Sequence, residues 1–176
     1  RNQEAAELIE EAIRINDNMT SSSTNKQITL KINLASNLSL QAKYQEAEDL
    51  LLSTLEESIG TLGENHPQTI FITNNLAYNY YRMGQYEKAL ELFREVVEKR
   101  QNIYSSGHYL LSTSYNNLAG LLSETGRFEE AEKVYQLGFE SLRENKGPDH
   151  PETLRYMNNI AMLDYRMGKM NEAIEL

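Results

Sequence analysis

The hydrophobic positions between residues 85 and 103 recur every three or four residues, as they do on one face of an α-helix. They are Tyr86, Ala89, Leu90, Phe93, Val96 and Val97. We therefore expect a helix from Gln85 to Ile103 with one buried face. A second amphipathic segment runs from Pro67 to Met83, and proline suits the first position of a helix. Gly84 separates the two segments and permits the positive φ of a tight helix end. The pattern predicts a hairpin of two antiparallel helices.

This pattern returns every 42 residues along the chain. The residues that recur include His66, His108 and His150; Gly84, Gly126 and Gly168; and Ala47, Ala89, Ala131 and Ala173. Adjacent asparagines recur as well, in the pairs Asn74 and Asn75, Asn116 and Asn117, and Asn158 and Asn159. One hairpin cannot bury both of its apolar sides, so neighbouring hairpins must stack. We predict a single array with units at 26–62, 67–104 and 109–146, a truncated unit at 151–176, and the second helix of a preceding unit at 1–17.

Small residues recur at two positions where neighbouring helices must approach closely. One position holds Ala35, Ala77, Ala119 and Ala161, and the other holds Ala12, Thr54, Val96 and Gly138. A glycine inside a helix costs about 1 kcal/mol relative to alanine, so we expect close packing at Gly138. Leu76, Ala77 and Tyr80 are expected to face the core, and Tyr86 to pack partly into it. The histidines are expected to cap the first helices, and the first unit departs from the pattern with Ala42 in place of glycine.

The motif in the clearest unit resembles the tetratricopeptide repeat. Its residues are Asn75-Leu76-Ala77, Tyr80, Gly84, Tyr86 and Ala89. The usual period of that repeat is 34 residues. The longer period of 42, with "LGENHPQT", "GPDHPET" and "NNLA", is similar to the subclass found in kinesin light chains and many bacterial proteins. The resemblance implies an all-α, right-handed α-solenoid of stacked antiparallel helix hairpins, a TPR superhelix whose first helices line a concave groove.

The paired asparagines stand in the middle of predicted helices, although asparagine is a mediocre helix former. Its amide carries donors and an acceptor, which complement a peptide group. In peptide-binding members of the family, asparagines in this column hold the backbone of an extended peptide, and the resemblance implies that role for Asn75, Asn117 and Asn159. The alternative is that they hydrogen-bond between neighbouring helices and keep the repeats in register.

One stripe along each first helix is assigned to the groove by its spacing. The candidate peptide-binding residues are Asn74, Asn75, Tyr78, Tyr81, Arg82, Asn116, Asn117, Arg155, Asn158, Asn159, Tyr165 and Arg166. Tyrosine offers flat amphipathic surface of the kind enriched at interfaces. Arginine can meet an acidic residue or a terminal carboxylate. The alternatives are partial core packing for the tyrosines and solvated surface for the arginines.

Composition narrows the class of protein. The net charge of −9 argues against a nucleic-acid partner, which needs a basic face. The chain has no cysteine, which is compatible with a reducing compartment, and we expect a cytoplasmic protein. Because no run of eighteen or more apolar residues occurs, we expect no membrane span. The chain starts without methionine and stops in mid-pattern, so we expect it to be part of a longer protein.

The sequence shows no motif of a catalytic or cofactor site, and we expect no enzyme activity and no cofactor. The three histidines are one repeat apart, about 10 Å by helix spacing, which is too far for shared metal coordination. The predicted function is a protein–protein interaction scaffold that binds an extended peptide or a partner helix in its concave groove. Two alternatives remain: a sensor or regulatory arm of a larger ATPase, protease or transcription regulator, and a structural module that associates weakly with itself through its exposed ends.

Overall fold

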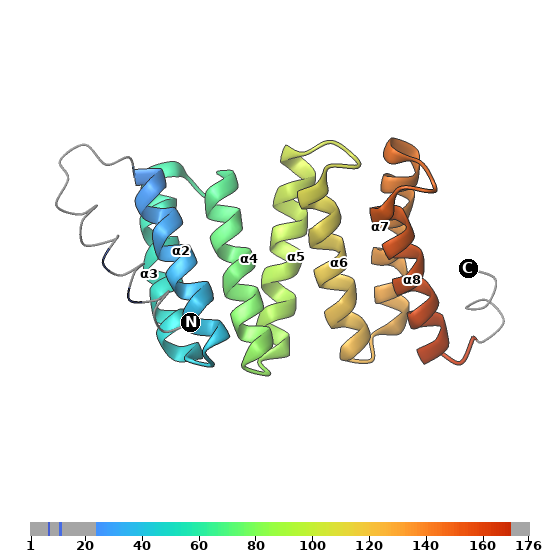
Figure 1. Ribbon diagram of the computed structural model, residues 1–176, viewed down its shortest axis with the longest axis horizontal. Coiled ribbons are helices and arrows are strands. Elements are labelled where there is room, and N and C mark those ends of the chain that lie inside the picture. Colours follow the sequence, from blue (N-terminus) through green and yellow to red (C-terminus); the bar gives the residue numbers. More distant parts are fainter. Residues whose placement is uncertain (1–6, 8–10, 12–23, 170–176) are drawn as a thin grey trace. The chain divides into compact units, whose positions relative to one another are not determined.

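The computed structural model describes residues 7, 11 and 24–169. Between residues 24 and 169 the chain forms seven helices and no strand (Figure 1). They are α2 (Thr24–Leu40), α3 (Tyr44–Leu62), α4 (Pro67–Arg82), α5 (Tyr86–Ile103), α6 (Tyr109–Glu124), α7 (Phe128–Lys146) and α8 (Pro151–Arg166). The predicted helix at 1–17 lies outside the described residues except for Glu7 and Glu11, and so do residues 170–176 of the unit predicted at 151–176.

The helices fall into two compact units, one ending at Leu92 and the other beginning at Phe93. In the first unit, α3 packs against both α2 and α4, and α2 also contacts α4 (Figure 1). In the second unit, α7 packs against both α6 and α8 (Figure 1). Helices α2, α3 and α4 are each 84 residues, or two repeat periods, before α6, α7 and α8. The two units can therefore be compared position by position.

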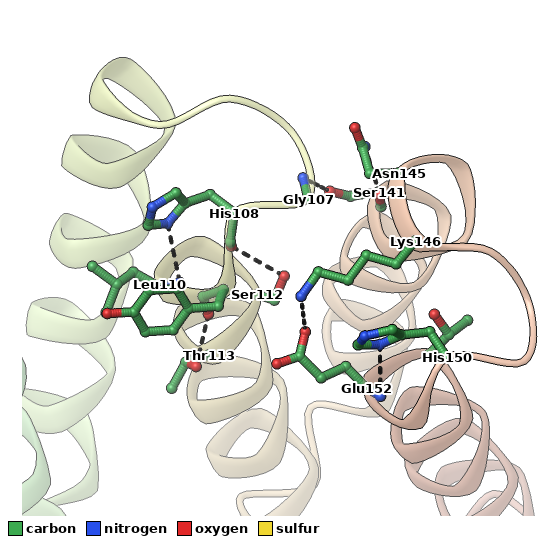
Figure 2. Close-up of polar contacts among 12 residues, drawn as sticks. Gly107, His108, Leu110, Ser112, Thr113, Ser141, Asn145, Lys146, His150 and Glu152 are labelled. Carbon is green, nitrogen blue, oxygen red and sulfur yellow. Dashed lines mark hydrogen bonds and ion pairs between the residues drawn. The ribbon is translucent and has the colours of Figure 1, made fainter.

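Three histidines start the first helix of their repeats, as the sequence predicts. Nδ1 of His66 accepts a hydrogen bond from the backbone N–H of Gln68 at 3.2 Å. His108 and His150 accept equivalent bonds from the backbone N–H groups of Leu110 and Glu152, each also at 3.2 Å (Figure 2). These bonds satisfy backbone donors that a helix start leaves without partners. In the middle repeat, which has no proline after its histidine, the His108 ring stacks on Tyr104 with centroids 4.0 Å apart.

The turns between paired helices need a residue in the left-handed region of backbone space. Gly84, Gly126 and Gly168 supply it with φ of 74°, 77° and 77°. At the equivalent place between α2 and α3, Ala42 adopts φ 61°. The first unit therefore makes the same turn as its neighbours without a glycine. Its alanine is strained there, because the Cβ disfavours this region of backbone space.

Close packing at Gly138 is confirmed. A Cβ built on this residue of α7 would lie 2.3 Å from Cε1 of Tyr156 in α8. The Tyr156 ring is fully buried, and its hydroxyl donates to the Ser112 carbonyl of α6. Burial raises the pKa of Tyr156. The bare backbone of α7 thus makes room for the largest side chain buried in this unit.

Leu76, Ala77 and Tyr80 are buried, as predicted. The Tyr80 hydroxyl donates to Glu48 Oε1 at 2.8 Å, and burial together with this carboxylate raises the pKa of Tyr80 to about 12. The prediction that Tyr86 packs into the core is wrong, because its side chain is 42% exposed. It is the first residue of α5, and its ring lies 6.0 Å from that of Tyr81.

One buried charge was not anticipated. Arg100 in α5 is only 3% exposed, and its Nη1 donates to the Leu110 carbonyl and to Ser114 Oγ, both in α6. Burial lowers the pKa of this guanidinium. In the next repeat the same position holds the buried Leu142.

Among the described residues, no helix is long and apolar enough to cross a membrane.

Candidate functional site

Asn75 lies on the face of α4 that points toward α2. Its Nδ2 donates to the Phe71 carbonyl one turn earlier at 2.7 Å, which holds the side chain against its own helix. Its Oδ1 lies 3.3 Å from the Ser36 hydroxyl of α2, but that hydroxyl has one proton and lies closer to the Ile32 carbonyl, at 2.9 Å. The Asn75 carbonyl oxygen therefore keeps accepting capacity for a further donor.

In the second unit the equivalent asparagine makes a shorter contact between helices. Nδ2 of Asn159 in α8 donates to Oδ1 of Asn116 in α6 at 2.6 Å. The partner differs because Asn116 corresponds to Ile32 in the first unit, which has no polar side chain to offer. The second unit thus supports the register role for this column of asparagines, whereas in the first unit Asn75 is bonded mainly to its own helix. The contact leaves Asn159 half-buried, so it does not exclude contact with a ligand.

The other candidate asparagines differ in exposure. Asn74 and Asn117 are half-buried, and Oδ1 of Asn74 is buried without a hydrogen-bond partner. Asn158 is exposed and lines a shallow pocket of about 300 Å³ with Ala161, Met162 and Tyr165. The second unit therefore brings Asn158 together with Tyr165 along one face of α8.

The predicted aromatic and basic residues of the first unit form one cluster. Tyr78 is 45% exposed, and its ring centroid lies 5.9 Å from that of Tyr81. Arg82 lies over the rings of Tyr44 and Tyr78 at 5.8 and 6.0 Å, and its Nη2 is 3.3 Å from the Tyr44 hydroxyl oxygen. Hydrogen bonds to Tyr78 and Tyr44 raise the pKa of Arg82. The guanidinium is therefore held between two tyrosines.

The basic residues of the second unit behave differently. Nη1 of Arg166, the counterpart of Arg82, donates to Ser123 Oγ in α6 at 2.8 Å. The counterpart of Tyr44 is Phe128, which has no hydroxyl to hold the guanidinium. Arg155 and Tyr165 are exposed on α8. Of the five candidate residues on α8, four are thus exposed, and Asn159 is half-buried.

A pocket that the sequence did not predict lies between α2 and α4. It has a volume of about 240 Å³ and is lined by Ala35, Ser36, Ser39, Leu40, Leu51, Asn75, Tyr78 and Asn79. Two of the candidate residues, Asn75 and Tyr78, belong to it. Asn79 is 1% exposed, and its Nδ2 donates to the Tyr44 carbonyl at 2.9 Å. The signal for Asn79 was in the repeat, because the next two units have buried leucines there, Leu121 and Leu163.

The loops at the opposite helix ends are tied together by side chains. The backbone N–H of Gly107 donates to Ser141 Oγ at 2.6 Å, and Lys146 pairs with Glu152 (Figure 2). This ion pair, more than any other group, lowers the pKa of Glu152. The described residues contain no group of three or more side chains that suits a metal ion. The histidines instead accept backbone hydrogen bonds, as described above.

Comparison with known proteins shows which family has this architecture. The family model for the tetratricopeptide repeat matches residues 26–102, 72–144 and 109–176, which together span most of the chain. No curated protein sequence matches.

Solved structures resemble the chain over nearly its full length. Two crystal structures of a kinesin-light-chain-type protein with nearly identical TPR-like repeats, from Podosopora anserina, give TM-scores of 0.86 and 0.84. Each is 26% identical and covers 99% of this chain and 82% of its own. BtubC (BKLC) from P. vanneervenii gives a TM-score of 0.85 at 19% identity, over 99% of this chain and 69% of its own, and shows the fold alone.

The apo form of RapI shares the fold as well, with a TM-score of 0.75 at 16% identity, over 93% of this chain and 45% of its own. The predicted all-α solenoid of stacked helix hairpins is confirmed by these neighbours and by the seven helices between residues 24 and 169. The chain belongs to the tetratricopeptide repeat family, in the subclass with kinesin-light-chain-like repeats.

Proposed function

We propose that the protein is a non-enzymatic, cytoplasmic scaffold that binds an extended peptide of a partner protein along the first helices of its repeats. The tetratricopeptide fold itself suggests a protein–protein interaction scaffold. The proposal adds the binding surface: the stripe of asparagine, tyrosine and arginine side chains on α4, α6 and α8. The repeat boundaries at 26–62, 67–104, 109–146 and 151–176 belong to the same proposal.

The observation that carries the proposal is that the asparagines of this column can still accept or donate hydrogen bonds to a ligand. Asn75 Oδ1 retains accepting capacity, and Asn159 remains half-buried although it donates to Asn116. A peptide backbone offers alternating donors and acceptors that such amides complement. Exposed rings beside them, Tyr78 and Tyr165, supply apolar contact area at low cost in conformational entropy.

A peptide-library selection on the purified domain tests the proposal. The same selection is run on a variant with Asn75→Ala, Asn117→Ala and Asn159→Ala, after circular dichroism has shown that it is folded. We expect the wild type to enrich a motif that the variant does not enrich. A matched control is Asn65→Ala with Asn102→Ala, because both asparagines are exposed and lie off the groove stripe. Equal enrichment by the wild type and the triple variant would assign the asparagines to internal register.

A further inference from the structure

The pocket between α2 and α4 holds two buried polar atoms without partners. Oδ1 of Asn79 and Oγ of Ser39 have no hydrogen bond, and Ser39 is only 6% exposed. The donors of Asn79 are already used, because its Nδ2 contacts the Tyr44 carbonyl and Met83 Sδ. A buried acceptor without a partner loses its hydrogen bond to water and gains none in return, which destabilises the folded state. Both oxygens are closed to solvent in this structure, so a donor reaches them only when the lining side chains shift. The pocket favours an occupant that brings hydrogen-bond donors and can drive that shift.

In the second unit, different side chains occupy the equivalent place. The counterpart of Leu51 is Tyr135, which is buried, and its hydroxyl lies 3.7 Å from a Cβ built on Gly120, the counterpart of Ser36. The counterpart of Asn79 is the buried Leu163. The two places thus differ in three side chains, at the positions of Leu51, Ser36 and Asn79.

A further difference concerns the hydrogen-bond partner of a serine that both units share. Ser123, the counterpart of Ser39, accepts a hydrogen bond from the guanidinium of Arg166. Arg82 is the counterpart of that arginine, but the Tyr44 hydroxyl and the Tyr78 ring hold it instead. The molecule thus contains its own precedent for a cationic donor at this serine, and in the first unit that donor is missing.

The surroundings also favour a cation with an apolar stem. Ala35, Ser36, Ser39 and Leu40 belong to the last turns of α2, where the helix dipole places partial negative charge. Leu40 and Tyr78 are exposed at the pocket and offer apolar surface. The net charge of −9 further favours a basic partner. The pocket volume of about 240 Å³ suits one side chain and lies below that of sites for drug-sized ligands.

We propose that this pocket is a specificity site for a lysine side chain of the bound peptide. The ammonium group donates to Asn79 Oδ1 and Ser39 Oγ, and the methylene stem lies along Leu40 and the Tyr78 ring. An acidic side chain would place its carboxylate oxygens against the Asn79 and Ser39 oxygens, and the pocket therefore disfavours it. This inference rests on the proposed function, since it names one residue of the peptide that the groove binds.

The test uses a small probe, Nα-acetyl-lysine N-methylamide, and NMR of the isotope-labelled protein. The reporter is the side-chain amide signal of Asn79. We expect saturable shifts with the lysine probe and affinity at least about tenfold weaker for the norleucine analogue, which replaces the ammonium with a methyl group. Equal behaviour of the two probes, or no response at Asn79 up to the solubility limit, overturns the proposal.

Two variants localise the effect. Leu51→Tyr introduces the side chain that fills the equivalent site of the second unit and should abolish binding of the lysine probe. Ser39→Ala removes one acceptor without adding bulk, so it remains informative if Leu51→Tyr does not fold, and it should weaken binding about tenfold. Unchanged affinity in a folded variant contradicts the proposal.

The outcomes also separate this inference from the proposed function. A selection that enriches peptides with no lysine preference, together with a silent Asn79 signal, removes the inference and leaves the scaffold function standing. If the lysine probe binds at Asn79 in a protein that enriches no peptide, the pocket keeps its affinity for lysine and the proposed peptide-binding function is removed.

Discussion

Gly138 and Tyr156 form a complementary pair across α7 and α8, in which one residue without a side chain accommodates a buried phenol ring. The Tyr156 Cε1 atom lies 2.3 Å from where a Cβ of residue 138 would be. At the two equivalent positions the preceding repeats have Val96 with Ser114 and Thr54 with Ile72. The last repeat is therefore the one that combines a glycine with a phenol ring at these positions.

We expect Gly138→Val to destabilise the protein by about 1–3 kcal/mol, because the ring cannot withdraw from a filled core. Tyr156→Ser alone should also destabilise it, since it leaves a cavity. The double variant restores the Val96 and Ser114 combination and should lose less than the two single variants together. Urea unfolding of all four proteins measures the coupling free energy. Strict additivity would show that the two side chains do not compete for space.

Tyr44→Phe should release Arg82. In the second unit, Phe128 stands at this position and Arg166 reaches Ser123. We therefore expect Arg82 of the variant to donate to Ser39 and to compete with the lysine probe, which weakens probe binding. A crystal structure of the variant and the Asn79 titration check the two halves. If Arg82 stays over Tyr78 and the affinity is unchanged, the Tyr44 hydroxyl is not what keeps the pocket open.

The raised pKa of Tyr80 predicts a loss of stability at alkaline pH. An unfolded tyrosine titrates near 10.0, whereas Tyr80 in the folded state titrates at about 12. Between these values the native state binds more protons than the unfolded state, so its stability falls as pH rises toward 12. Urea unfolding at about pH 9 and about pH 11 measures this slope. Tyr80→Phe should make the slope shallower, and the raised pKa of Tyr156 keeps part of it. At neutral pH the substitution should cost about 1 kcal/mol through the lost bond to Glu48.

The buried Arg100 gives a prediction that separates charge from volume. Its guanidinium has a carbonyl and a hydroxyl as partners, and burial lowers its pKa. Arg100→Leu introduces the residue of the next repeat, Leu142, and should change stability by no more than about 1 kcal/mol. Arg100→Lys keeps a buried charge without the planar set of donors and should cost about 1–3 kcal/mol. Thermal unfolding that ranks lysine above leucine would contradict this account.

The repeat period predicted most of the architecture, because each unit has the same pattern of helix starts, helix ends and buried positions. Histidine caps, the helix from Pro67 and the buried Leu76, Ala77 and Tyr80 follow from signals within about twenty residues. Close packing at Gly138 also followed, since a glycine in a helix needs a reason. The burial of Tyr86 was predicted wrongly. Periodicity assigns a residue to a face of the helix, but it does not say how much of a residue in the first turn the neighbouring helix covers.

The pocket could not be predicted from the same signals. It depends on Leu51 in α3 and on Asn79 and the position of Arg82 in α4, and these features depart from the repeat instead of following it. Asn79 was visible as a polar residue in a leucine column, but its orphaned oxygen depends on where the Tyr44 carbonyl lies. Likewise, the bond between Asn116 and Asn159 required the spacing between α6 and α8.

The chain has three histidines, and each uses Nδ1 to accept a hydrogen bond at the start of a different repeat. The proton of each neutral ring therefore resides on Nε2. Every one of these repeats thus carries a single imidazole whose tautomer reports whether its own helix start is formed. The three ring signals in an NMR spectrum therefore report the unfolding of three helix starts separately. During heating they distinguish an array that unfolds cooperatively from one that unfolds one hairpin at a time.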